Sequence, residues 1–182
     1  MIDLDVARRK FDREARSLEE SRAALRERGI FIEEMEFPHI HALFSLPFAL
    51  GRMVVFGARL GFEEYNLLPP SVLFVDPLSR RPLLRNELAV PGSIAGDLVS
   101  SAIVAAHPDT GFPFVCLRGF REYHTHPQHT DDPWEQYRYD GTTGTAYYCL
   151  EQIWLNMIVG ANVTIAFSVM RGLPRAALPH AQ

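Results

Sequence analysis

The chain has 182 residues, of which 47% are hydrophobic and 22% are charged, a balance typical of one folded domain with its own core. Its formal net charge is −4, with both signs interspersed, which argues against nucleic acid or an acidic membrane surface as a partner. No apolar run reaches the roughly 20 residues of a membrane span, and no N-terminal signal sequence is recognisable, so we expect a cytoplasmic protein with reduced cysteines.

Residues 3–28 are expected to form an amphipathic helix. Apolar residues recur at steps of three and four, at Leu4, Ala7, Phe11, Ala15, Leu18 and Leu25. Asp3 or Asp5 can cap the N-terminus, and Gly29 can supply the left-handed residue that ends the helix. The opposite face carries Arg and Glu and is expected to be solvated.

Residues 30–76 have the pattern of an antiparallel meander. Short apolar runs at Phe31–Phe37, His41–Leu50 and Arg52–Leu60 are separated by prolines and glycines. Because Pro69-Pro70 cannot lie inside a paired strand, we expect Tyr65–Pro70 to be a rigid extended loop before a strand at Ser71–Val75.

Two histidines of the meander, His39 and His41, would share one strand face. That geometry can hold a metal, but no third ligand lies near them in the sequence, so they are interpreted as strand-edge histidines. After the meander, residues 77–106 form an insertion whose last part, Ile94–Ala106, is expected to be a short helix or a covering segment.

The segment 107–134 is the densest in reactive groups and begins HPDTGFPFVCLRGFREYHTH. Val115–Leu117 has the pattern of a strand end, and the Thr110-Gly111 turn would let His107–Asp109 fold back beside the thiol of Cys116. From the residues alone, Cys116 can be a nucleophile, a metal ligand or part of the core.

The remaining residues predict a polar loop and a helical C-terminal part, 145–170. Trp134 is expected to pack under the loop, and Asp131-Asp132 to place negative charge near the cysteine. A helix at Thr145–Ile158 would bury an apolar stripe and an inert Cys149, after which Val163–Met170 packs on the core and Leu173–Gln182 is loose. The members of the stripe are Tyr147, Leu150, Trp154 and Met157.

Taken together, these motifs resemble the ubiquitin-conjugating (E2-like) family. The chain has, in order, an N-terminal helix, a strand meander, Tyr65 before Pro69-Pro70, His107-Pro108-Asp109, Cys116-Leu117, a tryptophan and C-terminal helices. The resemblance implies a single α+β domain over residues 1–182.

The resemblance also implies a chemistry centred on Cys116. It makes Cys116 the nucleophile that carries a modifier as a thioester, with His107 and Pro108 building the adjacent turn. Asp109 occupies the place of the asparagine credited in that family with stabilising the oxyanion. An ionised carboxylate would repel an oxyanion, and loss of one such donor costs about 100-fold in rate, so either Asp109 serves the attacking amine or transfer is weak.

Supporting roles near Cys116 fall to four further residues in this interpretation. Glu122 and His124 could tune the pKa of the thiol, while Asp131 and Asp132 could position or deprotonate an acceptor lysine. The expected partners are a ubiquitin-like β-grasp protein and an activating enzyme of a bacterial modification pathway, and no cofactor is required.

Two alternatives stay open. Cys116, Glu122, His124 and His126 are similar to the C-E-H-H pattern of a predicted metal-binding family from bacterial gene clusters that encode ubiquitin-like components, and this set of donors suits zinc. The chain could also be a non-catalytic adaptor of ubiquitin-conjugating type that binds the modifier or its activating enzyme.

Overall fold

The computed structural model describes residues 4–48, 51–65, 67–88, 104–129 and 131–159. The helices of the described chain are α1 (Leu4–Arg28), α2 (Arg121–His124) and α3 (Ala146–Trp154), with a 3-10 turn at Trp134–Gln136 and a π-helical turn at Leu155–Val159. The strands are β1 (Ile30–Glu36), β2 (His39–Phe48), β3 (Gly51–Gly61), β4 (Ser71–Val75), β5 (Val104–Ala106) and β6 (Pro113–Val115). These elements confirm the α+β class.

Strands β1 to β4 form one antiparallel sheet in the order β1-β2-β3-β4, which confirms the predicted meander. Alternation along the strands brings Phe44, Phe56 and Phe74 together in the core. The ring of Phe56 lies 5.0 Å from that of Phe44 and 5.5 Å from that of Phe74, between centroids. Aromatic contacts of this kind stabilise neighbouring strands beyond the area they bury.

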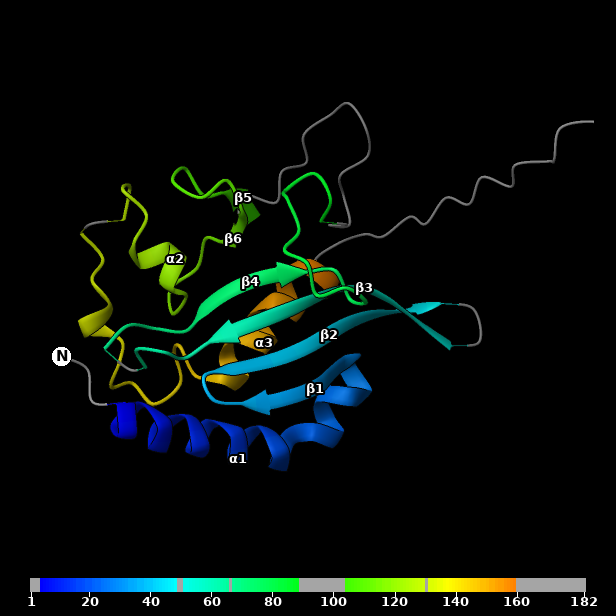
Figure 1. Cartoon of the computed structure of the whole chain (residues 1–182), viewed down its shortest axis with the longest axis horizontal. Coiled ribbons are helices and arrows are strands. Elements are labelled where there is room, and N and C mark those ends of the chain that lie inside the picture. Colours follow the sequence, from blue (N-terminus) through cyan, green and yellow to red (C-terminus); the bar gives the residue numbers. More distant parts are fainter. Residues whose placement is uncertain (1–3, 49–50, 66, 89–103, 130, 160–182) are drawn as a thin grey trace, which may run out of the picture.

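Helices α1 and α3 pack against this sheet, with α3 behind it and α1 along the β1 side (Figure 1). Leu18 and Leu25 of α1 and Leu150 and Ile153 of α3 are buried in the same apolar cluster as Phe44. The apolar stripes predicted for the two helices therefore face one common core, except at Leu4, which is 63% exposed.

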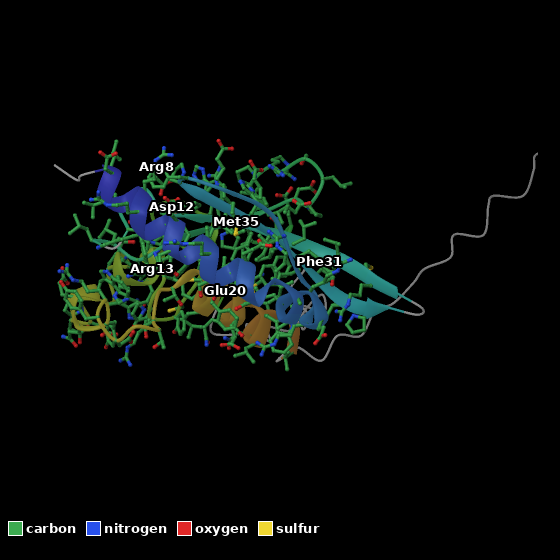
Figure 2. The ribbon with its side chains drawn as sticks, turned by 90° about the horizontal axis from the view of Figure 1, so that it is seen from below. Arg8, Asp12, Arg13, Glu20, Phe31 and Met35 are labelled. Carbon is green, nitrogen blue, oxygen red and sulfur yellow. The ribbon has the colours of Figure 1, made fainter. Side chains whose placement is uncertain are left out.

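The polar residues of α1 are exposed or partly exposed, except for one that is buried. Arg8, Asp12, Arg13 and Glu20, labelled in Figure 2, are all exposed. Glu14 is instead 6% exposed, and its carboxylate accepts hydrogen bonds from the Tyr65 hydroxyl (2.9 Å) and the Ala146 N–H (3.0 Å). One carboxylate thus joins α1 to the β3–β4 connection and to the first residue of α3.

Gly29 ends α1 as predicted. Its φ of +96° is in the left-handed region, and a Cβ there would lie 2.7 Å from the carbonyl oxygen of Ser45. The chain can therefore turn directly from α1 into β1.

The predicted extended loop at Tyr65–Pro70 is wrong in its first half. The Tyr65 N–H donates to Phe62 O (3.2 Å) and the Leu67 N–H to Glu64 O (2.8 Å), so the chain turns before it extends at Pro69-Pro70. The turn allows Tyr65 to bury its ring and to reach Glu14, which an extended chain from β3 would not permit.

The insertion 77–106 is described at residues 77–88 and 104–106. Its first part folds back on the sheet through a bridge between Pro82 and Val75, and Val104–Ala106 is strand β5 rather than the end of a helix. Residues 89–103, which contain most of the expected Ile94–Ala106 segment, lie outside the described residues, as do Val163–Met170 and Leu173–Gln182.

Strands β5 and β6 pair with each other and gather with α2 beyond β4 (Figure 1). This region carries the reactive segment 107–134. Within the part of the chain that the structure describes, no helix combines the length and apolarity needed to cross a membrane.

Candidate functional site

Cys116 directly follows β6, and its thiol is partly buried. The Sγ atom lies 3.3 Å from Nε2 of His129. Burial raises the pKa of the Cys116 thiol, which keeps the sulfur protonated and weakly nucleophilic at neutral pH. A neighbouring imidazole can accept the thiol proton and so restore the nucleophilicity of the sulfur. Cys116 and His129 therefore have the arrangement of a nucleophile and its base.

His129 contacts the thiol but is not among the candidates that the sequence analysis named. It lies in the loop after α2, its N–H donates to His126 O (3.0 Å), and its ring stacks on Tyr123 at 4.0 Å between centroids. The available signal was the third histidine in the spacing His124-x-His126-x-x-His129. The helix α2 and the turn after it bring His129 back to the cysteine, which the spacing alone does not indicate.

The His107–Asp109 turn lies at the other end of the β5–β6 hairpin from Cys116. The His107 N–H donates to Phe112 O (2.9 Å), so His107 is opposite a residue four positions before the cysteine. At ~3.3 Å per residue, that spacing separates the turn from Cys116 by on the order of 10 Å. The hairpin therefore does not set His107 directly beside the thiol.

Within that turn, His107 is buried and Asp109 is not. Nδ1 of His107 accepts from the Asp109 N–H (3.3 Å), while the Asp109 side chain is 72% exposed. The His107 ring meets those of Phe114 and His126 edge-on at 5.4 and 5.6 Å. The rings of His126 and His129 lie between His107 and Cys116, with centroids 5.6 Å apart for His107 and His126 and 5.4 Å apart for His126 and His129.

Glu122 faces the sheet. Both oxygens of its carboxylate accept from the Val72 N–H of β4, at 3.1 and 3.2 Å. Burial raises the pKa of Glu122 to about 7, against an ordinary value of 4.5. The carboxylate therefore fastens α2 to β4.

Replacement of Glu122 by Gln is expected to change how stability depends on pH. Because the folded-state pKa is raised, the wild type loses stability as the pH increases from about 4.5 to about 7, by on the order of 2–3 kcal/mol. Glu122→Gln keeps a hydrogen-bond acceptor without this loss, so it gains on the wild type over that interval. Urea unfolding at about pH 5 and about pH 8 measures the difference.

The exposed Glu135 provides the matched control. Glu135→Gln should leave the free energy of unfolding unchanged at both pH values. A difference between Glu122→Gln and wild type that is the same at both pH values would contradict the assignment.

His124 has both ring nitrogens occupied by the backbone. Nε2 accepts from the Gly119 N–H (3.1 Å), so Nδ1 carries the proton and donates to Asp132 O (2.9 Å). Burial lowers the pKa of His124, which favours this neutral form. His124 thereby ties the segment after Cys116 to the segment after His129.

The four residues of the suggested zinc set are not brought together. Glu122 binds β4, His124 binds backbone groups, and His126 stacks on Phe114 at 5.3 Å, while Cys116 contacts His129. Among the described residues, no three His, Cys, Asp or Glu side chains are grouped closely enough to hold a metal ion. On β2, the His39 and His41 rings are 6.3 Å apart, and His39 contacts Glu63.

The neighbouring residues Asp131 and Asp132 differ in exposure and in hydrogen bonding. Asp131 is exposed, whereas the Asp132 side chain is only 15% exposed and accepts from the Tyr137 hydroxyl, Arg118 Nε (2.7 Å) and the Tyr123 hydroxyl (2.7 Å). The hydrogen bond from Tyr137, followed by those from Arg118 and Tyr123, holds the pKa of Asp132 well below its usual range. The carboxylate oxygens of Asp132 are thus occupied by these three donors.

Trp134 and Cys149 occupy the places that were expected. Trp134 is 4% exposed beneath the loop, and Cys149 is fully buried in α3, where burial raises its thiol pKa. Cys116 is the more accessible of the two thiols.

Known proteins match most of the chain, including the segment that carries Cys116 and His129. A relative from Sinorhizobium fredii (strain NBRC 101917 / NGR234), the uncharacterized protein y4jH, is 32% identical over 169 residues, which cover 84% of this chain and 82% of its own length. A model of the Y4jH family, described as Y4jH-like, matches residues 2–95 and 95–160. The chain therefore belongs to the Y4jH-like family.

Proposed function

We propose that the protein is an acyl-transfer enzyme of the ubiquitin-conjugating type, in which Cys116 carries the C-terminus of a small β-grasp modifier as a thioester. The observation that carries this proposal is the 3.3 Å contact between Cys116 Sγ and His129 Nε2. A partly buried thiol whose pKa is raised needs such a base to react at neutral pH.

The reaction assigned to this pair is an exchange of thioesters. His129 takes the proton of Cys116 as the sulfur attacks the carbonyl carbon of a modifier already linked to the thiol of an activating enzyme. The new carbon–sulfur bond forms, the old one breaks, and the proton passes to the departing thiolate. An acceptor amine then attacks the Cys116 thioester and releases the thiol.

The order of elements supports this type of enzyme. Helix α1, the meander β1–β4, the prolines Pro69-Pro70, a cysteine after a short strand and the later helix α3 follow one another as the resemblance implies. Asp109 is exposed at the other end of the hairpin from Cys116, so the proposal assigns its carboxylate no part in the reaction at the thiol.

Loading of Cys116 tests the proposal. Purified protein is incubated with its candidate activating enzyme, the β-grasp modifier and ATP, then analysed on a non-reducing gel with a metal analysis of the same sample. We expect one band shifted by the mass of the modifier and removed by DTT. Cys116→Ser should lose the DTT-sensitive band.

Other outcomes of that experiment would overturn the proposal. One zinc per chain without a shifted band would make Cys116 a metal ligand. Modifier binding that needs no thioester and survives Cys116→Ala would make the protein an adaptor.

A further inference from the structure

The base opposite Cys116 is held in place by contacts outside the pair itself. His129 comes from a loop, and a loop imidazole needs support to keep Nε2 on the sulfur. Two described side chains provide it, Tyr123 from α2 and Asp132 from the turn after His129.

The first support is a flat ring contact. The Tyr123 ring stacks on the His129 ring at 4.0 Å between centroids and 20° between planes, which fixes the plane in which the imidazole nitrogens lie. His129 can then rotate only within a narrow range, because the Tyr123 ring blocks one of its faces.

The second support is the carboxylate of Asp132. Its Oδ2 accepts from the Tyr123 hydroxyl (2.7 Å) and from Arg118 Nε (2.7 Å). Arg118 is two residues after Cys116, and Asp132 is three residues after His129, where its N–H donates to His129 O (3.2 Å). One carboxylate therefore connects the backbone that carries the nucleophile with the backbone that carries the base.

We infer that Tyr123 and Asp132 are positioning residues that hold His129 against Cys116 by a ring stack and a shared carboxylate. This inference rests on the proposed function and assigns a role to two side chains that do not touch the thiol. Tyr123 acts on the orientation of the His129 ring, and Asp132 acts by fixing Tyr123 and Arg118. The ring stack and the carboxylate contacts are both needed to keep His129 at the thiol.

Alkylation of Cys116 by iodoacetamide tests this role without a modifier. The second-order rate is measured from about pH 6 to about pH 10 and assigned to Cys116 by peptide mass. Tyr123→Leu, which removes the stacking ring, should lower the rate near pH 7 by about 10-fold, a part of the about 100-fold loss expected for His129→Ala. Tyr123→Phe, which keeps the ring and loses the hydroxyl, should lower it by about 2- to 3-fold.

The dependence of the alkylation rate on pH distinguishes a misplaced His129 from damage to the fold. At about pH 10 hydroxide removes the proton, so the variants and the wild type should react at similar rates if only the base has moved. Asp132→Asn should lower the neutral rate by about 3- to 10-fold, since it weakens the charged contact with Arg118. Glu135→Gln changes an exposed carboxylate of the same loop and should leave the rate unchanged.

Two results would overturn the inference. If His129→Ala slows alkylation while Tyr123→Leu and Asp132→Asn react like the wild type, the positioning role fails and the proposed function stands. If His129→Ala itself has no effect, the base is misassigned and both fail. Should Tyr123→Leu prove unfolded by circular dichroism, Tyr123→Phe and Asp132→Asn decide the matter.

Discussion

His129→Ala is expected to slow the loading of Cys116 by about 100-fold at neutral pH, the usual contribution of a positioned general base. The burial that raises the thiol pKa leaves little thiolate, so the reaction depends on the imidazole 3.3 Å from the sulfur. The measurement is the single-turnover rate at which the DTT-sensitive band forms with saturating activating enzyme. A 100-fold change corresponds to about 2.7 kcal/mol in the barrier.

His41→Ala is the matched control for that experiment, because His41 lies on β2 outside the site. It should load at the wild-type rate. Equal loading by His129→Ala and the wild type would show that His129 does not take the proton, whatever the role of Cys116.

Glu14→Ala is expected to lower the free energy of unfolding by about 3 kcal/mol, because it leaves two buried donors without an acceptor. These donors are the Tyr65 hydroxyl, in the β3–β4 connection, and the Ala146 N–H, at the start of α3. The N-terminal end of α3 also loses the negative charge that its dipole favours. Urea denaturation measures the loss.

Two variants sharpen this prediction. Glu20→Ala makes the same change at an exposed position of α1 and should alter stability by less than about 0.5 kcal/mol. Glu14→Gln keeps one acceptor and should lose about half as much as Glu14→Ala. If Glu14→Ala and Glu20→Ala are equally stable, the hydrogen bonds that Glu14 accepts contribute nothing to stability.

Local pattern was enough to predict the main elements of the fold. The apolar spacing in α1, its stop at Gly29 and the strand at Ser71–Val75 follow from short-range rules of periodicity and turn chemistry, and the structure confirms them. The turn that buries Tyr65 could not be predicted in this way, because its reason is a long-range partner, Glu14, far earlier in the chain.

The site shows the same division. Cys116 could be proposed as a candidate because a cysteine after a short apolar strand and near several histidines is distinctive. Its partner could not, because α2 and the turn after it decide which histidine reaches the thiol. His124 and Glu122 were attractive candidates by residue type, but backbone groups of Gly119, Asp132 and Val72 occupy their polar atoms.

The most direct test of the central role of Cys116 uses no protein partner. The protein is mixed with a synthetic peptide thioester that ends in Gly-Gly, and the mass of the intact protein is followed with time. We predict the addition of one acyl group, mapped to Cys116, released by DTT and formed more slowly in His129→Ala. Acylation that does not occur, or that maps to a residue other than Cys116, would contradict the account.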